Sequence, residues 1–149
     1  MMAEAKPIAG TRPLAPKPMS PHLSIYRFKI NMILSIMHRV TGITNYFGSL
    51  ILAIWIASAA TSEQAFNTVS SYLATPLGLV ILIGFTWSVM HHMLGGIRHF
   101  VWDVGWGFSK EAVKFLSWAS LIGSITLTAI IWGYALSHWG HALSLWGAR

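Results

Sequence analysis

The sequence contains no cysteine and very few charged residues. Because none of its 149 residues is cysteine, disulfides, thiolate metal sites, iron-sulfur ligation and cysteine nucleophiles are excluded for this chain. Any metal would have to be held by histidine or oxygen. Charged residues make up 9% of the chain, against about 25% in a soluble domain, while 54% is hydrophobic. The composition therefore predicts an integral membrane protein.

Acidic residues are scarce, which leaves a net charge of +6. A basic balance can indicate nucleic-acid binding, but here the lysines and arginines are dispersed and form no dense run. Basic flanks of membrane spans explain the charge better, so no nucleic-acid partner is expected.

Long apolar runs are what the sequence has in abundance. They predict membrane-spanning helices at 40–60, 76–100 and 115–136, the first starting as early as Met32. Twenty-one residues at about 1.5 Å each cover the roughly 30 Å hydrocarbon layer. The segment 61–71 is predicted to be a short polar loop. The expected fold is an all-α membrane protein with three transmembrane helices.

The flanks of these spans predict the orientation and the division of the chain. Six lysines and arginines precede the first span, none lies between the first and second, and three, Arg98, Lys110 and Lys114, lie in the last turn of the second span or between it and the third. The positive-inside rule then places the amino terminus and the second connection in the cytoplasm.

Residues 1–30, which hold five of the six prolines in 1–21, are expected to form a cytoplasmic arm and interfacial segment that stays on the protein. Residues 31–137 form the transmembrane domain and 138–149 a short tail.

One polar cluster lies at the end of the second span. His92, Gly95, Gly96, His99 and Asp103 fall on one helical stripe, because a residue advances 100° around a helix. Imidazoles beside residues without bulk suit a flat ligand such as a porphyrin, whose iron takes a histidine nitrogen. The alternative is that the histidines are interfacial and the glycines serve helix packing.

A second polar cluster lies at the start of the first span. Ser35, His38, Arg39 and Gly42 again share one stripe. A hydroxyl, an imidazole and a guanidinium at the edge of an apolar region can hold a quinone carbonyl or a haem propionate. An arginine here can also simply extend to the lipid headgroups. The two clusters are expected to meet at the same membrane face.

These residues carry a resemblance to a known family. The pattern S-x-x-H-R-x-T-G occurs at 35–42 and the pattern H-x-x-x-G-I-R-H-x-x-x-D at 92–103, after RP at 12–13 and SPHLSIY at 20–26. In this order and spacing they resemble the cytochrome b556 membrane-anchor subunits of succinate dehydrogenase, over the whole three-helix chain.

The resemblance implies a subunit of a larger enzyme in the bacterial inner membrane, the mitochondrial inner membrane being the less favoured location. With a second small membrane subunit it would form a helical bundle around one shared haem b, and it would anchor a flavoprotein and an iron-sulfur protein. Succinate would be oxidised on those other subunits, with no catalytic residue in this chain. The share of this chain would be electron delivery to ubiquinone.

The resemblance also implies roles for individual residues. His92, four positions before the glycine of G-I-R-H, would be the axial ligand of the haem iron. Ser35 and Arg39 would line the ubiquinone site, and His38 and Arg39 would lie near the haem propionates. His91, a second histidine directly before this position, departs from the family pattern. The stripe favours His92, because His91 points about 100° away.

Two other functions stay open from the sequence. One is a self-contained b-type cytochrome with both axial histidines in this chain, for example His92 and His38. The other is a non-redox membrane anchor or small transporter in which the histidines only pack or handle protons.

Overall fold

The described part of the chain is built from helices alone. The structure is a computed structural model that describes residues 27–146, with side chains described to residue 138. Within that range the helices are α1 (Ile30–Thr61), α2 (Glu63–Leu73), α3 (Pro76–Asp103) and α4 (Lys110–Trp146). The arm at 1–26 lies outside the described residues, so only the end of the expected 1–30 segment can be compared.

Three of these helices are long and apolar enough to cross a membrane: α1, α3 and the part of α4 up to His138. The predictions of an all-α membrane protein and of three spans are therefore confirmed. The second span begins at Pro76 as expected, where a missing N–H costs nothing in the first turn. The third is longer than the expected 115–136, because helix α4 continues through part of the segment expected to be a tail.

The prediction of a polar loop at 61–71 is wrong, because this segment forms most of the helix α2. Ser62 caps α2, since its Oγ accepts a hydrogen bond from the Ala65 N–H at 3.1 Å. Glu63 in the first turn adds a negative charge that favours a helix start. The segment is polar by composition, and polarity alone did not separate a loop from a short surface helix.

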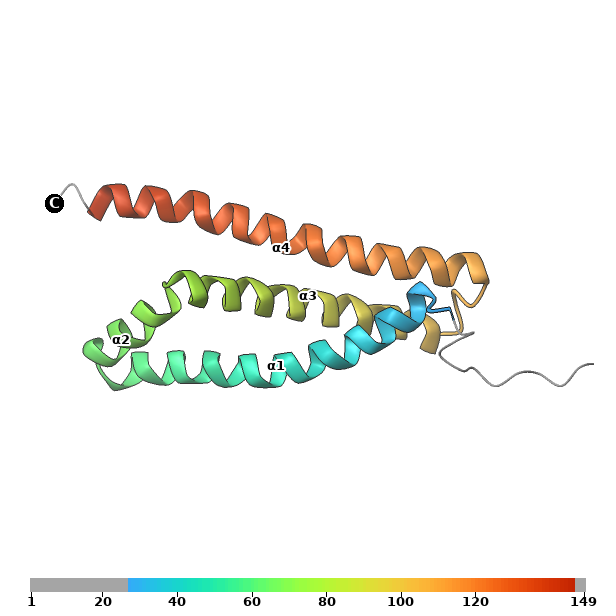
Figure 1. Ribbon diagram of the computed structural model, residues 1–149, viewed down its shortest axis with the longest axis horizontal. Helices are drawn as coiled ribbons and strands as arrows, with labels where there is room; N and C mark the ends of the chain where they lie inside the picture. The colour runs from blue at the N-terminus through green and yellow to red at the C-terminus, as the bar shows by residue number, and fades with distance from the viewer. Residues whose placement is uncertain (1–26, 147–149) are drawn as a thin grey trace, which may run out of the picture.

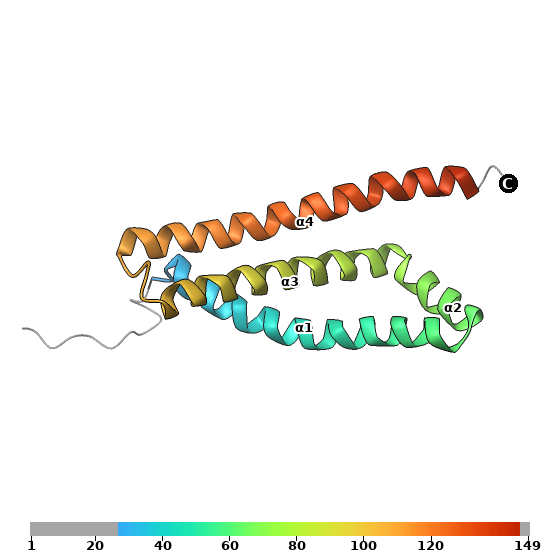
Figure 2. The same cartoon turned by 180° about the vertical axis from the view of Figure 1, so that it is seen from behind.

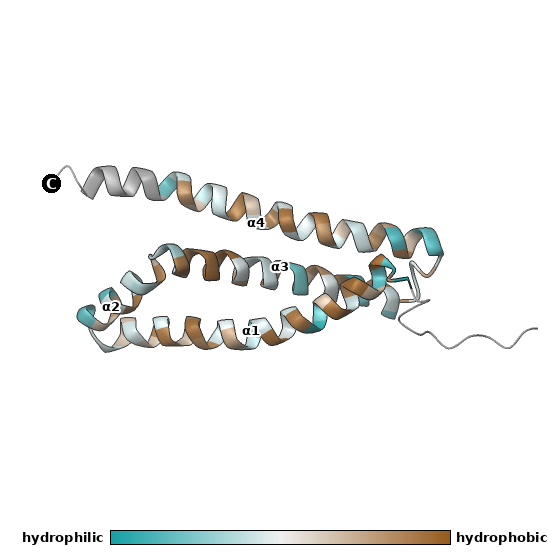
Figure 3. Cartoon of the chain, in the orientation of Figure 1, coloured by the Kyte–Doolittle hydropathy of each residue, from teal (hydrophilic) through white to brown (hydrophobic). Residues whose placement is uncertain are grey.

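The long helices run side by side. In Figures 1 and 2, α1 and α3 are antiparallel, α4 runs along α3, and α2 joins α1 to α3 at one end. At the other end, the start of α1 lies with the end of α3 and the start of α4 (Figure 1). Figure 3 shows hydrophilic positions at this end. The two polar clusters therefore meet at one end of the bundle, as predicted.

A tight connection joins α3 to α4 at that end. Gly105 and Gly107 have φ of 84° and 79°. This left-handed conformation is unfavourable for residues that carry a Cβ atom. Ser109 then caps the start of α4, because its Oγ accepts from the Ala112 N–H at 3.1 Å.

Small and polar residues fill the contacts between helices. Leu34 is the buried hydrophobic residue of the described chain, whereas the buried polar ones are Thr41, Ser58, Ser88, His91, Arg98, Ser117, Ser120, Ser124 and Thr128. Many large apolar side chains are exposed instead. This inversion is expected in a membrane, where lipid solvates apolar surfaces and helices associate through close packing and hydrogen bonds.

Ser88 illustrates these contacts and gives a first prediction. Its hydroxyl is buried and lies 2.8 Å from Asn45 Oδ1 and 3.1 Å from the Thr41 carbonyl oxygen, both on α1. We expect Ser88→Ala to destabilise the α1–α3 contact by about 0.6 kcal/mol and by roughly 1.7 at most, measured as a lower Tm of the purified protein in detergent. Ser49→Ala is the matched control, since Ser49 is exposed and bonds only within α1. An equal Tm for both variants would contradict the expectation.

Candidate haem and quinone site

His38 and His92 form a stacked pair between α1 and α3. Their ring centroids lie 4.0 Å apart and the planes are inclined by 7°. Both side chains are half-buried. The ring of His99, which lies two turns after His92 on α3, is 5.5 Å from the His38 ring. The structure thus brings together imidazoles from both predicted clusters.

A hydrogen bond to the backbone of α1 fixes the orientation of the His92 ring. Its Nδ1 lies 3.1 Å from the His38 carbonyl oxygen. A carbonyl oxygen only accepts, so Nδ1 carries the proton of the neutral ring and donates it. The other ring nitrogen, Nε2, then keeps its lone pair. This is the arrangement of metal-binding histidines, which donate the N–H on one side and ligate through the other.

His91 occupies a different environment on the other face of α3. It is 2% exposed, its Nδ1 lies 3.3 Å from Ser124 Oγ on α4, and its ring stacks on Trp87 at 5.2 Å. A wide ligand has no access to an imidazole enclosed in this way. The difference in burial supports the choice of His92 over His91 that the helical stripe suggested.

The glycines leave room mainly for the imidazoles themselves. A Cβ on Gly95 would come within 2.5 Å of His38 Nδ1, and a Cβ on Gly42 within 3.1 Å of His92 Cε1. A Cβ on Gly96, in contrast, would meet no neighbouring atom within 4 Å. The expected stripe of small residues therefore has two parts: Gly95 admits His38, while Gly96 leaves the surface beside His92 without bulk.

Ser35 and Arg39 lie on α1 around His38. Both side chains are exposed, and within the described residues neither has a hydrogen-bond or ion-pair partner. Ser35 lies one turn before His38 on α1, and Arg39 directly follows His38. The structure leaves both groups available to a ligand or to the membrane surface.

Sequence reasoning treated Arg98 only as a flanking charge. The structure buries it to 4% exposure between α3 and α4, with Nη1 donating to Ser117 Oγ at 3.4 Å. The signal was present in the sequence, because His91, Gly95, Arg98 and Trp102 recur at helical spacing and form a second stripe. Asp103, which was placed with His92, is exposed.

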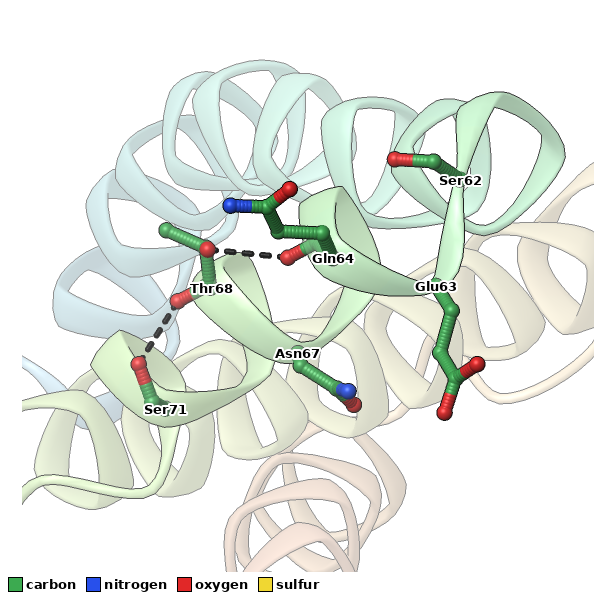
Figure 4. Close-up of a pocket in the computed structure, with 6 residues that line it drawn as sticks. All are labelled: Ser62, Glu63, Gln64, Asn67, Thr68 and Ser71. Carbon is green, nitrogen blue, oxygen red and sulfur yellow. Dashed lines mark hydrogen bonds between the residues drawn. The ribbon is translucent and has the colours of Figure 1, made fainter.

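A polar surface hollow lies far from these histidines, on α2 at the opposite end of the bundle. Figure 4 shows its lining by Ser62, Glu63, Gln64, Asn67, Thr68 and Ser71. The hydroxyls of Thr68 and Ser71 bond to carbonyl oxygens within α2. This hollow has no imidazole and belongs to the surface of a capped helix, so it is not part of the candidate site.

A three-span membrane protein with paired imidazoles at one end of its bundle is the class that this fold and site define. The chain belongs to the succinate dehydrogenase/fumarate reductase transmembrane subunit family, whose model matches residues 13–131. It is a multi-pass inner-membrane protein, as expected.

Similar proteins carry names that agree with this family. The chain is 36% identical over 116 residues to the succinate dehydrogenase cytochrome b556 subunit of Rickettsia felis, covering 78% of this chain and 90% of that protein. It is 36% identical to the protein of the same name from Paracoccus denitrificans, covering 76% and 88%. The cytochrome b560 subunit of Reclinomonas americana is 33% identical, covering 78% and 84%. These matches confirm the family that the motifs suggested.

Proposed function

We propose that this chain is the membrane-anchor and haem b subunit of a succinate:ubiquinone oxidoreductase. The observation that carries the proposal is the hydrogen bond from His92 Nδ1 to the His38 carbonyl oxygen. It holds the ring of His92 in place and leaves Nε2 free to bind iron. The names of the similar cytochrome b556 subunits support haem b as the group that this nitrogen would bind.

The residues around His92 fit a haem in three respects. Its ring is half-buried rather than enclosed, Gly96 leaves the adjoining surface open, and the basic side chain of Arg39 on α1 is available to propionate carboxylates. His38 Nδ1 is buried against Gly95 without a hydrogen-bond partner among residues 27–138, so a ligand would meet the other edge of this ring. When bound, the haem would supply one-electron redox chemistry.

Ser35 and Arg39 are proposed to bind ubiquinone at the same end of the bundle. Reduction places negative charge on a quinone carbonyl oxygen, and a guanidinium close to that oxygen stabilises the charge where the dielectric is low. The Ser35 hydroxyl would orient the ring by donating a hydrogen bond. Their exposure on α1 supports this role, since neither group is engaged by another described residue.

The remaining parts of the enzyme are proposed to lie on partner chains. A flavoprotein and an iron-sulfur protein would oxidise succinate, and a second small membrane subunit would share the haem. The sequence of this chain has no cysteine for an iron-sulfur cluster. The many exposed apolar side chains on α1, α3 and α4 offer surface for a second set of membrane helices.

The self-contained cytochrome is disfavoured by the geometry of the histidine pair. In that alternative, His38 and His92 would hold one haem between them. His38 and His92 instead lie face to face, 4.0 Å apart, with no space for a macrocycle between them. The test is to express this chain with and without the second anchor subunit. The proposal expects haem to be lost without the partner, whereas a self-contained cytochrome would keep it.

The amino-terminal arm gives a further prediction, although residues 1–26 lie outside the described residues. If the arm and the interfacial segment dock the iron-sulfur partner on the cytoplasmic face, deleting residues 1–30 releases the dehydrogenase from the membrane. We expect succinate-dye reductase activity to move into the soluble fraction after cell breakage. A complex that stays membrane-bound and still reduces quinone would show that docking lies elsewhere.

A further inference from the structure

Among residues 27–138, Arg98 is a buried cation without a counter-ion. Its side chain is 4% exposed, Nη1 donates to Ser117 Oγ at 3.4 Å, and Nε is buried without a hydrogen-bond partner in that range. No carboxylate of the described residues pairs with it, and Asp103 and Glu111, the acidic residues at this end of α3 and α4, are exposed. A guanidinium held away from water without an anion is costly, because protein burial removes its hydration.

Trp102 adds a second unpaired donor at the same place. Its ring lies 5.1 Å from the Arg98 guanidinium carbon, and its Nε1 is buried without an acceptor. The connection between α3 and α4 passes close by, since a Cβ on Gly107 would lie 3.7 Å from Trp102 Nε1. Arg98 and Trp102 therefore offer donors only. A set of donors around a positive charge is complementary to an oxyanion.

The depth of Arg98 indicates where such an oxyanion comes from. Helix α3 has 28 residues, or about 42 Å, so its ends extend beyond the roughly 30 Å hydrocarbon layer. Arg98 lies about 7.5 Å from the end of α3 at Asp103, which places it at the boundary with the headgroups. The exposed Lys110 and Lys114 begin α4 at the same end, as Figure 1 shows for the helix ends. Phosphate groups of the bilayer are the most abundant oxyanions at this depth.

We propose that Arg98 and Trp102 bind the phosphate of a phospholipid between the ends of α3 and α4, while the fully buried Ser117 holds the guanidinium from behind. Basic pockets between transmembrane helices bind anionic headgroups in this way. Arginine suits the role because its planar fork matches two phosphate oxygens. Arg98 lies on the α4 side of α3, whereas His92 faces α1. Trp102 lies between the two sides, because its ring also meets the His99 ring edge to face at 5.2 Å. The residual exposure of Arg98 is the point at which a phosphate oxygen would approach.

The experiment counts phospholipids on the intact complex. The complex is purified through a tag on this chain, washed extensively in detergent and measured by native mass spectrometry, as wild type, Arg98→Gln and Lys110→Gln. The expected result is one phospholipid fewer on Arg98→Gln, with an unchanged count on Lys110→Gln, whose cation is exposed. The same count for wild type and Arg98→Gln overturns the proposal.

A milder variant and an add-back measurement keep the test decisive if Arg98→Gln fails to assemble. Trp102→Phe keeps the ring and removes one donor, so phosphatidylglycerol should stabilise the delipidated complex at concentrations about tenfold higher than for wild type. Equal concentrations for both would overturn the site. Stabilisation by sodium phosphate alone would show a free-ion site in place of a lipid site. Loss of the haem band in Arg98→Gln without loss of lipid would identify the oxyanion as a haem carboxylate and overturn the lipid assignment.

Discussion

Replacement of His92 with alanine is expected to abolish or severely perturb the low-spin b-type haem spectrum of the complex. The His92 ring is half-buried rather than enclosed, and the bond from its Nδ1 to the His38 carbonyl oxygen leaves Nε2 available to bind iron. It lies about 9 Å deeper along α3 than Arg98, within the hydrocarbon layer. If His92 holds the haem as proposed, its removal would leave the iron without a protein ligand from this chain. The measurement is a reduced-minus-oxidised difference spectrum.

His91→Ala is the matched control for this prediction. His91 is enclosed between α3 and α4, where it meets Ser124 and Trp87, so its loss should leave the spectrum largely intact. Normal haem in the His92 variant together with haem loss in the His91 variant would shift the ligand by one position. That result would also mean that α3 rotates substantially when the partner subunit binds.

Substitution of Ser35 or Arg39 is expected to separate two activities of the complex. Ser35→Ala and Arg39→Leu should lower succinate-to-ubiquinone turnover about ten- to a hundredfold, because losing one hydrogen bond to a developing charge costs about 1.5 to 3 kcal/mol. Under the proposed function, succinate is oxidised on other subunits and neither side chain takes part in that step. Reduction of an artificial dye that takes electrons from the soluble subunits should therefore stay near normal. Steady-state assays of the same membranes with both acceptors measure the separation.

Thr44→Ala serves as the control for the quinone prediction. Thr44 is also an exposed hydroxyl on α1, but it bonds within its own helix to the Val40 carbonyl oxygen at 3.0 Å, and both activities should persist. A parallel fall of dye and quinone activities in the Ser35 and Arg39 variants would indicate a role in assembly. Full quinone activity in both would indicate that Arg39 only extends to the headgroups and that quinone binds elsewhere.

The spans could be predicted from the sequence because their signals are strong and local. The apolar runs, the proline at the start of α3 and the small number of charges each act over one helix and do not depend on partners. The wrong prediction of a loop at 61–71 also has a local cause. The capping hydroxyl of Ser62 converts a polar segment into the helix α2, and polar composition carries no information about such a cap.

The site could be predicted only in part. Helical spacing placed His92 and His38 in polar clusters that meet at one end, and the structure brings their rings together. Spacing could not show that Gly95 lies against His38 instead of a ligand, because that contact depends on how closely α1 and α3 approach. The burial of Arg98 could not be predicted for the same reason, because it depends on the position of α4. Contacts between helices are decided by packing, which a single stripe does not encode.

The most direct test of the proposed function is the reduced-minus-oxidised spectrum of the complex isolated through this chain, with succinate-dye reductase activity measured on the same sample. We predict a b-type haem band on chemical reduction and dye reduction by succinate, because the chain would bind haem at His92 and assemble with the subunits that oxidise succinate. A complex without a haem band would contradict the role of His92, and a sample in which succinate reduces no dye would contradict the proposed assembly.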